Sequence, residues 1–83
     1  MKVFSVKDTK ANYYTPPQLY RNSQEAVRAV TNSVNGSGET LFAKNSEDFA
    51  LFEIGSFDET AGKIESCEKR HICDLIDLRT EDK

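Results

Sequence analysis

The sequence has little of what most enzymes, disulfide-rich proteins and membrane proteins depend on. It holds two cysteines, one histidine and two prolines in 83 residues. No apolar run approaches the roughly 18 residues that a membrane span requires. The stretch before Lys7 has too few apolar residues for the core of a signal peptide. Two cysteines do not form a disulfide framework, so we expect reduced thiols and a cytoplasmic protein.

Length and composition favour one folded domain over residues 1–83. Apolar residues make up 37% of the chain and charged residues 30%, which is typical of a globular domain and not of a disordered chain. A chain of this size buries only about 60% of its unfolded surface, so its core is thin. The charged end, 79–83, is expected to fray. We see no repeat, low-complexity tract or linker.

Three segments have the pattern of β-strands. Residues 2–6 are short and rich in Val and Phe, and 49–57 are apolar on both parities, as in a strand covered on both faces. After the turn sequence 58–62, residues 63–68 return antiparallel and complete a β-hairpin. Pro16 and Pro17 remove two amide donors, so the segment around them is predicted to be an edge strand or an ordered loop.

Residues 22–36 have the pattern of a helix. Asn22 and Glu25 form a plausible capping box, with Ser23 as a competing cap, and valines recur at helical spacing behind them. Gly36 is expected to end the helix in the left-handed conformation. Residues 36–48 are interpreted as a flexible connection with an apolar anchor, and 72–78 as a short helix or a last strand.

These elements predict an α+β fold: a small antiparallel sheet of three to four strands with one helix packed on one face. A single helix leaves the other sheet face uncovered in a monomer. Phe49, Leu51 and Phe57 are predicted to lie on that face and to form the interface of a homodimer.

Cys67, His71 and Cys73 form the pattern C-x3-H-x-C, which matches no common zinc spacing and lacks a fourth ligand. A Cys-His nucleophile would also need an orienting group and an oxyanion hole, and nothing in the sequence indicates either. We therefore expect two unligated thiols and a surface histidine, with a metal or nucleophilic site as the alternative. No catalytic residue, metal or cofactor is predicted. The acidic residues at 47–59, including Glu53, are interpreted as solvated turn and cap carboxylates.

Charge is distributed unevenly along the chain. The net charge is −3, but residues 1–30 carry five basic side chains against two acidic ones, a net +3. Basic residues interleaved with aromatic ones suit single-stranded nucleic acid, because cations follow phosphates while bases stack on rings. The candidate nucleic-acid-binding residues are Lys2, Lys7, Lys10, Arg21, Arg28, Tyr13, Tyr14 and Tyr20. The alternative is that the tyrosines cover the edge of the core.

The segments "MKVFSVKDTKANYYTPP", "AVRAVTNSVN" and "NSEDFALFEIGSFDETAGKI" together resemble the small nonstructural protein of microviruses, in particular the gokushoviruses, which are single-stranded-DNA phages. The likeness covers residues 1–65. It leaves out the tail from Cys67, and "NGSGETLF" stands where a shorter turn is expected.

The resemblance implies a nonenzymatic accessory protein of the infected bacterium's cytoplasm. Such a protein would act in viral genome replication or packaging by binding single-stranded DNA or the replication complex. The alternative function is a protein–protein adaptor that dimerises through the apolar hairpin face without contacting DNA.

Overall fold

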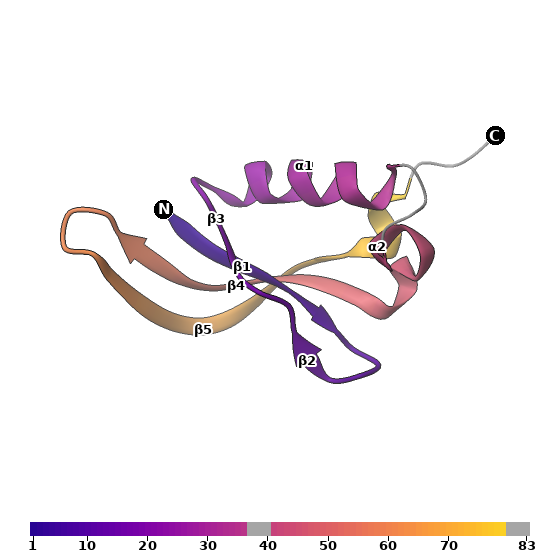
Figure 1. Ribbon diagram of the computed structural model, residues 1–83, viewed down its shortest axis with the longest axis horizontal. Coiled ribbons are helices and arrows are strands. Elements are labelled where there is room, and N and C mark those ends of the chain that lie inside the picture. Colours follow the sequence, from indigo (N-terminus) through magenta and orange to yellow (C-terminus); the bar gives the residue numbers. More distant parts are fainter. Residues whose placement is uncertain (37–40, 80–83) are drawn as a thin grey trace.

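The computed structural model describes residues 1–36 and 41–79, and it has the predicted α+β architecture. Figure 1 shows helix α1 lying across one face of a twisted antiparallel sheet. The sheet has five strands, against the three to four predicted, with β1 paired to β2 and β3 on one side and to β4 on the other. The strands are β1 (Lys2–Asp8), β2 (Tyr13–Tyr14), β3 (Gln18–Tyr20), β4 (Phe49–Asp58) and β5 (Lys63–Asp74); the helices are α1 (Ser23–Val34) and α2 (Leu41–Lys44), with short 3-10 helices at Ser46–Asp48 and Leu75–Leu78.

The edge beside β1 is one extended segment split by two prolines, as predicted. Pro16 and Pro17 separate β2 from β3 because they have no amide hydrogen to donate to β1. Thr15 maintains the pairing just before the break. Its amide and its hydroxyl both donate to the Val6 carbonyl, at 2.8 and 2.9 Å, and its own carbonyl accepts from the Ser5 hydroxyl at 2.7 Å.

Two hairpin turns share one construction. The Asp58 carboxylate accepts the amide hydrogens of residues 60 and 61, and the amide of Gly62 closes the turn on the Asp58 carbonyl at 2.8 Å. Asp8 does the same for residues 10 and 11, and Asn12 closes that turn at 2.7 Å. Gly62 and Asn12 both have positive φ, 66° and 65°. The predicted turn chemistry at 58–62 is confirmed.

Helix α1 begins where the sequence predicts and stops two residues earlier. The Asn22 side chain accepts the amide hydrogen of Glu25 at 2.9 Å, so Asn22 is the N-cap, not Ser23. Ala26, Val30 and Val34 are buried against the sheet. Among the described residues only Asn12 and Gly62 have positive φ, so Gly36 does not take the left-handed conformation that we expected.

The core lies between α1 and the sheet, and it contains two residues that the sequence placed elsewhere. Phe49 and Leu51 are 3% and 1% exposed and pack in the cluster that includes the helix valines. They cannot form a dimer interface, because they point towards α1 and not away from it. The parity of 49–57 was ambiguous, since neither set of alternating residues is polar.

The segment before β4 is more ordered than predicted, and 72–78 contain both predicted alternatives, the end of a strand and a short helix. Residues 37–40 of the expected flexible connection, and 80–83 of the expected frayed end, lie outside the described residues. From residue 41 the chain forms α2 and then a 3-10 helix. Leu75, in the last 3-10 helix, is 0% exposed and closes the end of the core.

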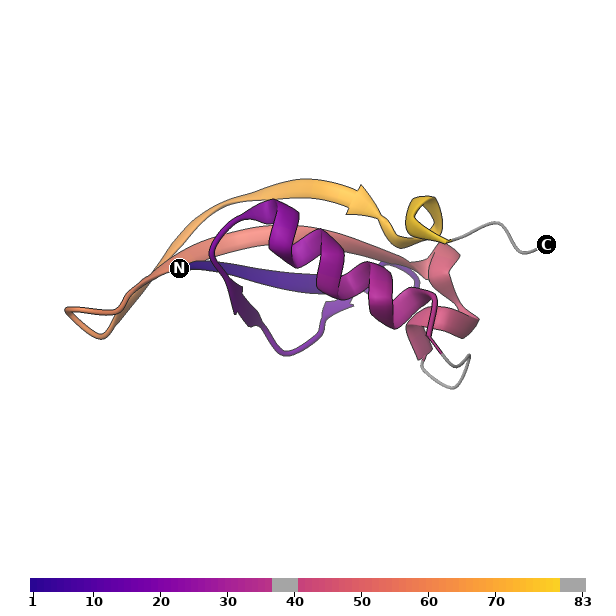
Figure 2. The same ribbon diagram turned by 90° about the horizontal axis from the view of Figure 1, so that it is seen from above.

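Strand β5 is twice as long as predicted and pairs irregularly with β4. It continues to Asp74 instead of residue 68, and its register shifts twice along β4. The hairpin tip projects past the start of α1, as Figures 1 and 2 show. In the described parts of the chain, no helix is long and apolar enough to cross a membrane.

Candidate nucleic-acid interface

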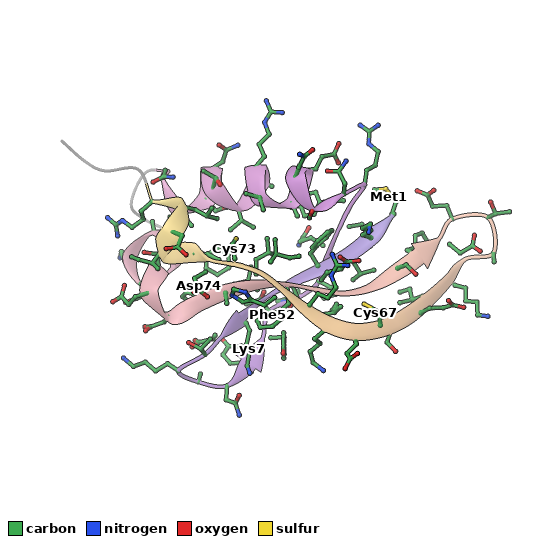
Figure 3. All side chains as sticks on the ribbon, turned by 180° about the vertical axis from the view of Figure 1, so that it is seen from behind. Met1, Lys7, Phe52, Cys67, Cys73 and Asp74 are labelled. Carbon is green, nitrogen blue, oxygen red and sulfur yellow. The ribbon has the colours of Figure 1, made fainter. Side chains whose placement is uncertain are left out.

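The sheet face opposite α1, called the outer face below, carries a cluster of aromatic and basic side chains. Strand register places the side chain of Phe52 opposite Ser5 and His71, away from the core. Figure 3 shows Lys7 and Phe52 on this side of the sheet. The outer-face cluster consists of Lys7, Tyr14, Phe52, Lys69 and His71.

Three rings of the cluster form a row across the strands. The ring centroids of Tyr14 and Phe52 are 5.9 Å apart with an interplanar angle of 74°. Those of Phe52 and His71 are 5.4 Å apart at 76°. Edge-to-face contacts of this kind are the preferred geometry of aromatic pairs, so each ring helps to fix its neighbour. The row therefore runs from β2 over β4 to β5 and presents π-surface on the outer face.

Two lysines from different strands converge on one ring of this row. The Nζ atoms of Lys7 and Lys69 lie 5.5 and 5.9 Å from the centroid of Tyr14, within the range of cation–π attraction. Neither lysine has a carboxylate within ion-pair distance in residues 1–36 and 41–79. Their positive charges are thus available to an anion. His71 is engaged with Asp74, whose Oδ1 lies 2.8 Å from Nε2.

Only two of the eight predicted nucleic-acid-binding residues belong to the cluster, Lys7 and Tyr14. Three of the others form ion pairs within the chain: Lys2–Glu53 at 3.5 Å, Lys10–Asp48 at 3.9 Å and Arg21–Glu25 at 3.2 Å. Arg28 is exposed on α1, in the layer on the other side of the sheet. The predicted basic residues are therefore dispersed and do not share one face.

The tyrosines are divided in the same way. Tyr20 packs against the core, with its ring 5.9 Å from that of Phe4, as the alternative reading of the tyrosines expected. Tyr13 is 52% exposed and points to the opposite side of its strand from Tyr14. Of the three rings, Tyr14 alone lies beside both lysines.

The sequence analysis did not assign Phe52, Lys69 or His71 to a nucleic-acid site. A signal was present, because "KRH" at 69–71 is a basic run in the acidic part of the chain. The run falls between the predicted strand 63–68 and the predicted element 72–78, whereas the structure places it within β5. Lys69 and His71 lie on the outer face with the rings of the row, whereas Arg70 lies on the other side with Glu53.

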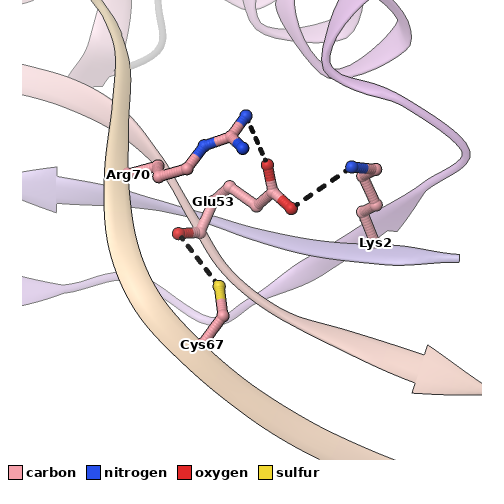
Figure 4. Close-up of polar contacts among 4 residues, drawn as sticks. All are labelled: Lys2, Glu53, Cys67 and Arg70. Atoms are coloured by element: carbon pink, nitrogen blue, oxygen red, sulfur yellow. Dashed lines mark hydrogen bonds and ion pairs between the residues drawn. The ribbon is translucent and has the colours of Figure 1, made fainter.

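Glu53 was expected to be solvated, but it is the one charged residue that is buried in the described parts of the chain. It is 7% exposed and lies between two cations, Lys2 at 3.5 Å and Arg70 at 3.2 Å, as Figure 4 shows. The Oε1 atom is close to the Arg70 guanidinium without a well-directed hydrogen bond. We regard the contact as an ion pair set by charge and distance. This ion pair joins β5 to β4, and the ion pair of Glu53 with Lys2 joins β4 to β1.

Cys67, His71 and Cys73 do not converge. His71 contacts Phe52 on the outer face, whereas Cys73 packs against the core. Burial raises the pKa of the Cys73 thiol above its ordinary value, and the nearby charges of Asp74 and Asp77 raise it further. This thiol is therefore protonated at neutral pH and is a poor nucleophile. Within 1–36 and 41–79, no three His, Cys, Asp or Glu side chains are grouped as metal ligands would be.

A cleft of about 330 Å³ opens between α1 and the split edge strand. Its lining is mostly apolar, with Phe4, Tyr20 and Val30 among its walls and Ser5, Thr15 and Gln18 as polar members. Its lining holds no Asp, Glu, His, Cys, Lys or Arg side chain. The cleft therefore offers no acid–base pair for catalysis.

Two apolar side chains of the outer face are buried within the single chain. Val3 and Ala50 are only 4% and 3% exposed there, although α1 lies on the other side of the sheet. Of the predicted interface, Phe57 alone is outside the core; it pairs directly with Ile64, which is 70% exposed.

Comparison with known proteins gives one family. The family model described as Phage ORF5 protein matches residues 1–78. The match includes most of the tail that the sequence resemblance left out. No curated protein and no solved structure matches the chain.

Proposed function

The chain belongs to the Phage ORF5 protein family, and on this premise we propose that it is a nonenzymatic phage accessory protein that binds single-stranded nucleic acid through the outer-face cluster. Its place of action is the cytoplasm of the infected bacterium, in replication or packaging of a viral genome. The resemblance to microvirus nonstructural proteins supports a single-stranded-DNA genome as the target.

The observation that carries the proposal is the pairing of free cations with a row of rings. A duplex exposes phosphates and keeps its bases stacked inside, so three aromatic side chains would add nothing to its binding. A single strand offers both phosphates and base faces. Lys7 and Lys69 supply the charge for phosphate, while Phe52 and His71 supply ring surface beside them.

Binding by so few cations must be weak and sensitive to salt. Each phosphate contact on a single strand contributes about −0.7 to the slope of log K against log salt, so two lysines give a slope of about −1.4. The net charge of −3 opposes the approach of a polyanion to the rest of the surface. Ligand and protein therefore meet at a small site and not over a broad basic face.

The test is a fluorescence anisotropy titration with a labelled oligothymidylate at about 50 mM salt and above. Lys7→Ala and Lys69→Ala should each weaken binding several-fold and reduce the salt slope by about 0.7. Arg28→Ala is the matched control, since it removes the same charge from the exposed side of α1. Absence of binding at low salt, or equal losses from all three variants, would exclude the proposed site.

The exposed Ile64, paired with the half-buried Phe57, favours a second candidate, an adaptor that pairs with another copy through the hairpin tip. Apolar side chains exposed at a projecting tip commonly mark a contact surface. Sedimentation of the wild type and of Ile64→Lys distinguishes the two candidates. A dimer that the substitution dissociates supports the adaptor, and a monomer at all concentrations removes it.

A further inference from the structure

We infer that Glu53 is a positioning residue for the outer-face cluster, although its carboxylate lies on the α1 side of the sheet. The inference rests on the proposed function, because it concerns how Lys69 is held beside Tyr14. It assigns a role to a buried charge that the fold alone does not require, since an apolar side chain would fill the same position.

Regular strand pairing does not fix the position of Lys69. Glu53 pairs with Arg70 and Gly55 pairs with Ser66, so three residues of β5 lie opposite the single residue Ile54. Lys69 is one of these three, and we call residues 67–69 the β5 bulge. Bulged residues leave the ladder, and bulges re-aim side chains next to functional sites. The contacts at the two ends of the bulge therefore decide where Lys69 points.

Glu53 supplies contacts at both ends. Its Oε1 lies 3.2 Å from Nη2 of Arg70, the residue directly after the bulge. Its main-chain carbonyl accepts a long contact of 4.0 Å from the Sγ of Cys67, the first bulge residue. Figure 4 shows both contacts diverging from Glu53 to the two ends of the same stretch of β5. Glu53 of β4 thus contacts β5 on both sides of Lys69, at Cys67 and at Arg70.

A third contact of Glu53 reaches β1, the strand that carries Lys7. The Glu53 Oε2 lies 3.5 Å from Nζ of Lys2, at the start of β1, and Lys7 lies near the end of β1. Since β1 and β5 are separated by β4, no ladder hydrogen bonds join them. The shared carboxylate is the electrostatic link between them, and it helps to set the separation of the two cations at Tyr14.

Glu53 is more buried than the two cations that it contacts, and this difference determines the effect of a substitution at Glu53. The Glu53 side chain is 10% exposed, whereas those of Lys2 and Arg70 are 44% and 63% exposed. Removing the carboxylate charge leaves two cations that water can solvate, so the sheet keeps its core. The change that follows is release of Arg70 and of the β5 bulge.

Whether Glu53→Gln weakens or strengthens binding distinguishes a positioning role of Glu53 from the effect of its negative charge alone. Removing a negative charge near a polyanion site strengthens binding on electrostatic grounds. Positioning predicts the opposite for Glu53→Gln: several-fold weaker binding and a salt slope reduced by about 0.7, as for loss of one phosphate contact. Glu65→Gln is the matched control, because it removes the same charge from an exposed site on β5 and should leave binding unchanged or tighter.

The experiment titrates labelled oligothymidylate with the wild type, Glu53→Gln, Lys69→Ala and the double variant. The double variant should bind like Lys69→Ala alone, because residues that act through one contact are not additive. Glu53→Gln that binds as tightly as the wild type, while Lys69→Ala binds weakly, overturns the inference and leaves the proposed function intact. A wild type that does not bind overturns the proposed function instead.

A readout without ligand tests the positioning directly. In the free protein, Glu53→Gln should shift the NMR signals of the Lys69 amide and the Tyr14 ring, and circular dichroism should report an unchanged fold. Unshifted signals overturn the inference. If Glu53→Gln does not fold, Arg70→Lys takes its place; it keeps the charge but not the guanidinium geometry, and the same losses and shifts are expected.

Discussion

At Gly55 the two long strands come so close that no side chain fits between them. A Cβ built there would lie 2.4 Å from the main-chain oxygen of Glu65, well inside van der Waals contact. The β5 bulge follows directly after this crossing, and β5 can bend over β4 only because Gly55 has no side chain. The conformation at Gly55 does not need positive φ; the requirement is space alone.

Gly55→Ala should therefore lower the free energy of unfolding by about 1–3 kcal/mol, the usual cost of overpacking. Urea denaturation followed by circular dichroism measures it. Gly62→Asn is the control, since Gly62 is also a glycine of this hairpin but has open space around it. Asn12 already holds the equivalent place in the other turn at a φ of 65°, and Asn tolerates this conformation better than most side chains, so this variant should destabilise the protein less than Gly55→Ala does.

Cys73 gives stability a dependence on alkaline pH. Its folded-state pKa is raised above the ordinary thiol value of 9.0 by burial first and by the charges of Asp74 and Asp77 next. Above pH 9 the unfolded chain loses this proton while the folded chain still holds it, so stability falls as pH rises towards the folded-state pKa. Cys73→Ala should flatten this fall in urea unfolding between pH 8 and pH 10.5; an unchanged slope would assign it to other groups.

Helix α1 depends on one cap. Asn22→Ala removes the acceptor for the Glu25 amide hydrogen and should cost about 1 kcal/mol, whereas Ser23→Ala should cost a few tenths. Thermal unfolding of the two variants measures the difference. Equal losses would mean that Ser23 shares the capping, as the sequence alone allowed.

Elements with local chemistry could be predicted from the sequence. Asn22 caps a helix, Asp58 and Gly62 close a turn, and the two prolines split an edge strand, each because of bonds between near neighbours. The length of β5 could not be predicted in the same way. Its residues are exposed and mixed in polarity, so only pairing with β4 keeps them extended.

The candidate site was predicted only in part because it is built from residues that are distant in sequence. Lys7 and Tyr14 lie in the basic N-terminal third that composition singled out. Phe52 was taken as an ordinary strand residue, and Lys69 reaches the same place through a bulge that no periodicity indicates. The distribution of charge along the sequence indicated that the N-terminal third is basic. Strand register determines which of the charged side chains lie on the same face of the sheet.

For the whole molecule, the order of the strands in the sheet determines which strand unfolds locally first. Strands β1 and β4 are flanked on both sides, and Phe4 and Leu51 within them are each 1% exposed. Strand β5 has a neighbour on one side only. Amide exchange should therefore be slowest in the middle of β1 and β4 and fast for the outward-pointing amides of β5.

Hydrogen exchange followed by NMR tests this order. Slow exchange of every second amide along β5 fits the expectation, because those amides face β4. Uniformly slow exchange along β5 would contradict it and would mean that a second chain covers this edge.

The turns at Asp8–Asn12 and Asp58–Gly62 have the same hydrogen bonds, so the sequence of one turn could replace that of the other. Each is a five-residue cassette closed by its own aspartate, and Figure 1 places the two at opposite ends of the sheet. The first carries Lys10 and the second carries Glu59. Trading the two cassettes would reverse this part of the molecular dipole while net charge and backbone stay the same.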